Sequence, residues 1–84
     1  MASHIKQDDL VSKIDELNRI AWEIRVSDSN KAAQNRREAI ELSKKINYKL
    51  GLADGLSIEG FGFIRMSDFN KALVCLNQAK IIYE

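Results

Sequence analysis

The stretches Arg25–Ala33 (RVSDSNKAA) and Arg65–Leu73 (RMSDFNKAL) share the pattern Arg-x-Ser-Asp-x-Asn-Lys-Ala and begin 40 residues apart. Six of the eight pattern positions are identical in the two copies. A pattern that recurs at a fixed spacing of roughly 20 to 50 residues is typical of proteins that stack similar structural units. We therefore expect a repeat architecture, in which both copies occupy equivalent places.

The repeated pattern has the composition of a turn followed by a helix start. Ser, Asp and Asn cap helices well because their side-chain oxygens accept hydrogen bonds from backbone N–H groups that have no partner in the first turn. We expect the first copy to start a helix near Lys31 and the second to start one at Phe69. The candidate caps of the first copy are Ser27, Asp28, Ser29 and Asn30.

The spacing of apolar residues predicts four helices. Those before the first copy recur at steps of three and four and predict an amphipathic helix from about Asp8 to Val26; they are Leu10, Ile14, Leu17, Ile20, Ala21 and Ile24. Three further helices are expected. The second begins near Lys31 and ends at about Asn47, the third extends from about Leu50 to Met66, and the fourth extends from Phe69 to Glu84. The chain has no proline, the commonest helix breaker.

Glycines make the third helix the least regular of the four. Each costs about 1 kcal/mol relative to alanine in a helix interior. Gly60 has a packing rationale, because it lies 39 residues after Ala21 and small residues let two helices approach closely. The others, Gly51, Gly55 and Gly62, have no such counterpart in the sequence.

These patterns predict an all-α fold of two antiparallel helix-turn-helix repeats. Repeat one covers about residues 8–47 and repeat two about residues 48–84, and residues 1–7 are expected to be a flexible N-terminus or a cloning remnant. A chain of 84 residues suits one small domain. It lacks an apolar run of about 20 residues and the apolar core of a signal peptide, which favours a cytoplasmic location.

Composition gives little support for catalysis or cofactor binding. The net charge is +1, and the single cysteine, Cys75, excludes an internal disulfide. No Cys or His pair has metal-ligand spacing, and His4 is the only histidine. Cys75 lies in an apolar run that is expected to raise the pKa of its thiol. The glycines follow no strand, so they form no phosphate loop. We expect no enzyme activity, cofactor or metal.

Small and apolar residues at fixed places in both units resemble the tetratricopeptide repeat. In the second unit they are Gly60, Phe63, Phe69, Ala72, Leu76 and Ala79, and in the first they are Ala21, Ile24, Ala32 and Ala39. The units depart from that pattern because they lie 40 residues apart instead of about 34 and lack the terminal proline. Arg36 replaces an expected apolar residue, and Glu59 stands where leucine is common.

The resemblance implies a short right-handed solenoid whose concave face is lined by the first helix of each unit. The residues expected to face a ligand are Asp15, Asn18, Trp22, Arg25, Asp54, Ser57, Phe61 and Arg65. Aromatic and guanidinium groups are favoured in protein contact sites. The alternative is that Trp22 and Phe61 only seal the space between neighbouring helices. The family's clamp for a C-terminal carboxylate is not expected, because acidic and aromatic residues stand at its positions.

The fourth helix has a second candidate surface. Ten of the last sixteen residues are apolar, more than one inner stripe can bury. We expect an association face formed by Leu73, Val74, Ile81 and Ile82. It would meet a further repeat, a second copy of the chain or another protein. The alternative is a four-helix bundle in which the fourth helix is central.

Residues 31–50 hold six basic and two acidic side chains, a local charge of +4. A basic helix can contact nucleic-acid phosphates, but the low overall charge favours a solvated face. The long period resembles that of repeats in bacterial signalling proteins. This resemblance implies a protein-interaction module that is part of a larger cytoplasmic signalling protein. The alternative is a self-association domain that binds no separate peptide.

Overall fold

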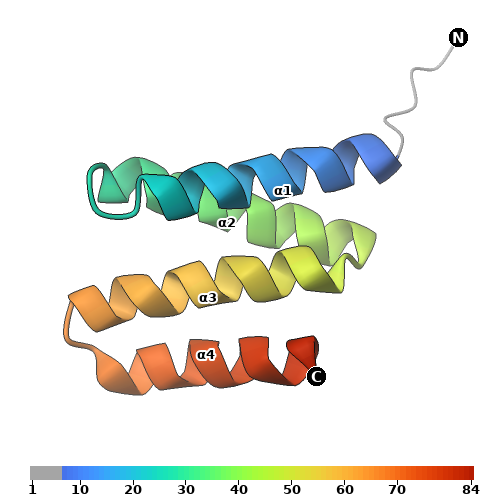
Figure 1. Ribbon diagram of the computed structural model, residues 1–84. Helices are drawn as coiled ribbons and strands as arrows, with labels where there is room; N and C mark the ends of the chain where they lie inside the picture. Colours follow the sequence, from blue (N-terminus) through green and yellow to red (C-terminus); the bar gives the residue numbers. More distant parts are fainter. Residues whose placement is uncertain (1–6) are drawn as a thin grey trace, which may run out of the picture.

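The computed structural model describes residues 7–84, which form four helices and no strand. Figure 1 shows the helices in a row in chain order; they are α1 (Gln7–Glu23), α2 (Ser29–Ile46), α3 (Lys49–Arg65) and α4 (Phe69–Tyr83). The predicted all-α class is confirmed. Residues 1–6, including His4, lie outside the described part of the chain, and Gln7 belongs to α1 instead of the predicted flexible start.

The helix ends differ from the predicted ones mainly at the first turn. α1 ends at Glu23 and not at Val26, and the chain turns from residue 24 onward. The Arg25 guanidinium donates a hydrogen bond to the Trp22 carbonyl at this helix end, at 2.6 Å. α2 begins at Ser29, two residues before the predicted start. Asn47 and Tyr48 link α2 to α3, so both helix ends lie one residue before the predicted ones.

The aspartates of the repeated pattern perform the same task in both copies. Asp28 accepts a hydrogen bond from the backbone N–H of Lys31 at 3.2 Å, and Asp68 accepts one from Lys71 at 3.3 Å. Each aspartate is the N-cap of the helix that follows. The prediction of a turn plus a cap is therefore confirmed.

α3 is the central helix of the row. It packs against α2 on one side and α4 on the other, and it also touches α1. Within the described part of the chain, no Cα atom of α4 lies within 8 Å of one in α1 or α2. The alternative of a bundle with a central fourth helix is therefore wrong, because α4 forms the edge.

Three of the four glycines allow α3 to take this central place. A Cβ atom added to Gly51 would lie 2.6 Å from Ile14 Cγ2 and from Ser43 Oγ. At Gly55 it would lie 2.5 Å from Ile40 Cγ1, and at Gly60 it would lie 2.9 Å from the Leu76 side chain. The expectation that only Gly60 has a packing reason was too narrow. Gly62 alone has open space around it.

Alanines dominate the buried core. The five alanines that the family resemblance singled out are each at most 4% exposed; they are Ala21, Ala32, Ala39, Ala72 and Ala79. Ala53, Ile14 and Ile58 are buried with them. Small side chains bring the helix axes close together but bury little apolar area each, so the stability of the fold depends on close backbone packing.

The two residues that depart from the family pattern bind each other. Arg36 on α2 donates to a carboxylate oxygen of Glu59 on α3 at 3.1 Å, and their side chains are 19% and 27% exposed. Charges that leave water require a partner to offset the lost hydration. An ion pair between α2 and α3 thus stands at two positions where apolar residues were expected.

Substitution of two glycines by alanine tests the close approach of α3. Gly51→Ala should lower the free energy of unfolding by about 1–3 kcal/mol, because the new methyl group would overlap with Ile14 and Ser43. Gly62→Ala is the control and should raise it by up to about 1 kcal/mol, because alanine favours a helix and the site is open. Urea unfolding followed by circular dichroism measures both, and equal effects would contradict this packing.

The Arg36–Glu59 pair makes a second prediction. Arg36→Leu alone should cost about 1–3 kcal/mol of unfolding free energy, because it leaves the partly buried carboxylate of Glu59 without its cation. Arg36→Leu combined with Glu59→Leu should recover most of that loss, because both partners then become apolar. Urea unfolding of the two variants decides the point, and a double variant no more stable than Arg36→Leu would contradict the role of the pair.

Candidate functional site

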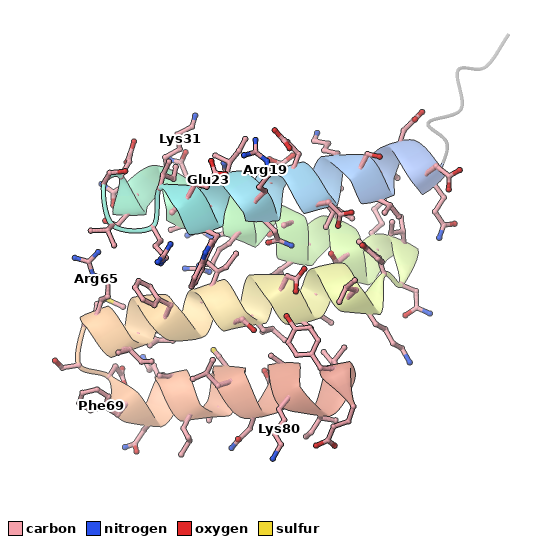
Figure 2. All side chains as sticks on the ribbon, viewed as in Figure 1. Arg19, Glu23, Lys31, Arg65, Phe69 and Lys80 are labelled. Carbon is pink, nitrogen blue, oxygen red and sulfur yellow. The ribbon has the colours of Figure 1, made fainter. Side chains whose placement is uncertain are left out.

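A groove of about 440 Å³ lies between α1 and α3 and reaches the end of α4. Five of the eight residues predicted for the concave face line it, namely Asp15, Asn18, Trp22, Asp54 and Ser57. Arg19, Tyr48, Leu50, Ile58 and Tyr83 complete the lining. We call this surface the α1–α3 groove. Figure 2 shows side chains of α1 and α3 extending into the space between the two ribbons.

The other three predicted residues lie around a second hollow of about 350 Å³, between the first half of α2 and the last half of α3. They are Arg25, Phe61 and Arg65. Ile58 borders both spaces. The structure therefore divides the predicted concave set between two neighbouring depressions instead of one continuous surface.

An aromatic and guanidinium cluster stands between the two depressions. The rings of Trp22 and Phe61 meet edge to face with centroids 5.8 Å apart. The Arg25 guanidinium lies 3.6 Å from the Trp22 ring centroid and 5.0 Å from that of Phe61. This contact joins α1 to α3, as the sealing alternative predicted. Trp22 nevertheless remains 47% exposed and lines the α1–α3 groove.

The two arginines of the repeated pattern do different things. Arg25 covers the Trp22 ring and binds the Trp22 carbonyl. Arg65 extends back to the first turn, where it donates to the Arg25 carbonyl at 3.4 Å. The identical sequence therefore gives identical caps at the aspartates but not identical arginine contacts.

Two tyrosines that the sequence did not single out hold the two acidic residues of the groove. The Tyr48 hydroxyl donates to Asp15 at 2.8 Å, and the Tyr83 hydroxyl donates to Asp54. Each bond joins residues about thirty positions apart, so helical periodicity gave no signal for it. Each aspartate keeps a second carboxylate oxygen that has no partner among the described residues.

Asn18 is less open than the sequence suggested. Its side chain is 5% exposed, and its amide donates to the Gly51 carbonyl at 3.0 Å. This bond fixes the first turn of α3 against α1. The Asn18 Oδ1 atom is buried, and within residues 7–84 it meets no hydrogen-bond donor.

The remaining charged side chain of the groove is already neutralised. Arg19 donates to Glu16 at 2.6 Å and 2.9 Å and to Glu23 at 2.7 Å. The bond to Arg19 lowers the pKa of the Glu16 carboxyl, and the two carboxylates raise the pKa of Arg19. The cation of Arg19 is therefore matched on α1 itself.

The predicted association face of α4 does not lie on one side of the helix. Leu73, Val74 and Ile81 are exposed and Ile82 is half-buried. Successive residues turn by about 100°, so Leu73 and Ile82 point in opposite directions. Steps of four and three connect a different row instead, which we call the α4 stripe: Phe69, Leu73, Leu76, Lys80 and Tyr83. In Figure 2, Phe69 and Lys80 extend away from α3.

The structure also places the other candidate groups. Burial raises the pKa of the Cys75 thiol, and the Glu59 carboxylate adds to the effect, as the sequence predicted. Within the described residues, no three His, Cys, Asp or Glu side chains lie close enough together to hold a metal ion. In the basic segment 31–50, Arg36 forms an ion pair with Glu59, so its charge is already neutralised within the protein.

Comparisons of the chain with protein-family models, with curated proteins and with solved structures gave no match. The α1–α3 groove is therefore interpreted from its own residues. None of the helices in residues 7–84 is long and apolar enough to cross a membrane.

The bond between Tyr48 and Asp15 predicts an alkaline titration. Burial, the hydrogen bond to Asp15 and the charges of Asp15 and Asp54 together raise the pKa of Tyr48 to about 12 from its ordinary value of 10.0. The stability that this bond contributes should be complete below pH 10 and be lost as the pH rises toward 12.

Asp15→Asn should lower the pKa of Tyr48, because the carboxylate charge is removed while the ring stays half-buried. Tyrosine-labelled NMR titration measures the pKa of each phenol separately. Tyr83, which binds Asp54, is the internal control and should keep its raised pKa. A Tyr48 pKa that does not change on Asp15→Asn would contradict the role of this bond.

Proposed function

We propose that the chain is a pair of tetratricopeptide-like repeats in a short right-handed solenoid that binds another protein. Three observations support the repeat assignment. The N-caps recur, the alanines of both units are buried, and α3 packs against both helices of the first unit. Successive units of a solenoid contact each other in this way.

The proposed binding surface is the α1–α3 groove. The observation that supports it most is the side chain of Trp22, which is 47% exposed at the edge of a 440 Å³ groove. Its contacts with Arg25 and Phe61 fix the orientation of the ring. A fixed aromatic surface loses little conformational entropy on binding, and tryptophan is enriched among the residues that dominate binding energy.

The proposed mechanism is passive binding of a peptide segment or partner helix, without a chemical step. The groove would present Trp22, Asp15 and Asp54 to that segment, and the Tyr48 and Tyr83 rings would limit its width. Such a module would serve as a regulatory or scaffold part of a larger cytoplasmic signalling protein, as the resemblance to bacterial signalling proteins implies.

Selection from an unbiased displayed peptide library tests the binding function. The folded chain should enrich peptides whose affinity falls about tenfold or more on Trp22→Ala, because truncation removes the exposed ring. Circular dichroism of the variant should show unchanged helicity. Val26→Ala is the control, because Val26 is exposed and lines neither depression, and it should leave affinity unchanged. A library that yields no Trp22-dependent binder would reject the site.

A second candidate function is self-association through the α4 stripe, and the internal repeat favours it. Forty residues before Leu76, Lys80 and Tyr83 stand Arg36, Ile40 and Ser43 of α2. Those three meet α3 at Glu59, Gly55 and Gly51. On the equivalent surface of α4, Leu76 and Tyr83 contact α3 at Gly60 and Asp54, whereas Phe69, Leu73 and Lys80 are exposed. A second copy of the chain would extend the row by covering that surface.

Light scattering after size exclusion tests that candidate over a wide range of protein concentrations. If the α4 stripe associates, Phe69→Glu combined with Leu73→Glu should convert an assembly into helical monomers, because charge on the stripe opposes burial. Val74→Glu combined with Ile81→Glu, on the other flank, is the matched control and should leave the assembly intact. A wild-type chain that is monomeric at every concentration would reject self-association.

A further inference from the structure

The hydrogen-bonding capacity of the α1–α3 groove is unbalanced. Most of its side-chain donors are engaged within the protein: Tyr48 binds Asp15, Tyr83 binds Asp54, and the Asn18 amide binds Gly51. The indole N–H of Trp22 and the Ser57 hydroxyl are the other neutral donors on the lining. Burial and the bond to Asp54 raise the pKa of the Tyr83 phenol, and the nearby Ser57 hydroxyl opposes this shift.

The capacity that remains belongs chiefly to acceptors. Asp15 and Asp54 each keep one carboxylate oxygen without a partner in the described chain. Asn18 adds a buried carbonyl oxygen that also has none. A bound group that supplies hydrogen-bond donors would therefore complement the two free carboxylate oxygens.

The charge in the groove is negative where these acceptors lie. Arg19 is the one cationic side chain on the lining, and each of its three nitrogen atoms already donates to Glu16 or Glu23. The carboxylates of Asp15 and Asp54 both act on the Tyr48 hydroxyl and raise its pKa. The two aspartates therefore contribute to the same local potential.

Aromatic rings surround this negative region. Trp22, Tyr48 and Tyr83 line the groove together with the two aspartates. The faces of aromatic rings attract cations, and tryptophan does so most strongly. Arg25 already shows this preference from the protein's own side, where it stacks 3.6 Å from the Trp22 ring centroid. Arg25 borders the second hollow and not the α1–α3 groove, so it leaves the groove open.

We propose that the α1–α3 groove selects a lysine or arginine side chain of the bound segment, which places its cation between Asp15 and Asp54 against the aromatic rings. The proposal rests on the proposed binding function and names the chemistry of the partner: a basic peptide segment. The ammonium or guanidinium group supplies hydrogen-bond donors and positive charge, which are the two properties that the groove lacks.

The direct test is NMR titration of the isotope-labelled chain with N-acetyl-arginine amide, and with N-acetyl-citrulline amide as the neutral probe of nearly the same shape. Arginine amide should shift the Trp22 indole signal and the backbone signals of Asp15 and Asp54. Citrulline amide should shift them at least about fivefold less at equal concentration, because it lacks the charge. Equal shifts, or none from either probe, would overturn the proposal.

Two double variants that remove the same charge, one inside the groove and one outside it, show where arginine amide binds. Asp15→Asn combined with Asp54→Asn should weaken binding of arginine amide about tenfold, because both carboxylates are neutralised. Asp8→Asn combined with Asp9→Asn removes the same charge from the exposed start of α1, outside the groove, and should change binding less than twofold. Equal weakening by both pairs would show a general charge effect and reject a site at the groove.

The peptide selection separates failure of this proposal from failure of the binding function. Basic residues should be enriched among Trp22-dependent peptides, and replacement of the key arginine by citrulline should abolish most of the affinity. Trp22-dependent peptides without basic residues, insensitive to the two Asn substitutions, would overturn cation selection and leave the binding function in place. A library without any Trp22-dependent peptide would reject the binding function, whatever the small probes show.

Discussion

The close approach of α3 to α1 and α2 is the constraint on which the rest of the structure depends. Gly51 faces Ile14 and Ser43 with no room for a side chain, and Gly55 faces Ile40 in the same way. Glycines destabilise a helix, so contacts with the neighbouring helices must stabilise α3. One such contact is the hydrogen bond from Asn18 to the Gly51 carbonyl. It fixes the distance between α1 and α3 and therefore the width of the α1–α3 groove.

The contact between α2 and α3 also depends on an ion pair. Arg36 and Glu59 stand where apolar residues were expected, and they form an ion pair at 3.1 Å. Such a pair is specific in direction as well as in distance, since a guanidinium requires an acceptor. It fixes the register of α2 against α3, where the small alanine core provides few interlocking side chains.

Local patterns in the sequence predicted local structure well. Asp28 and Asp68 cap helices because each cap depends only on the next three residues. Contacts between distant residues were harder to predict. The bonds of Tyr48 to Asp15 and of Tyr83 to Asp54 depend on where two helices cross, and so does the pairing of Arg36 with Glu59. The candidate site was predicted in part, because helical spacing identified five of the residues that line the groove but could not reveal the two tyrosines.

Intermolecular nuclear Overhauser effects on a bound basic peptide would test the central claim most directly. The account predicts contacts from the peptide to the rings of Trp22, Tyr48 and Tyr83, with the basic side chain nearest to Asp15 and Asp54. Contacts that gather at Phe69 and Leu73 would instead place the binding surface on the edge helix and contradict the proposed role of the groove.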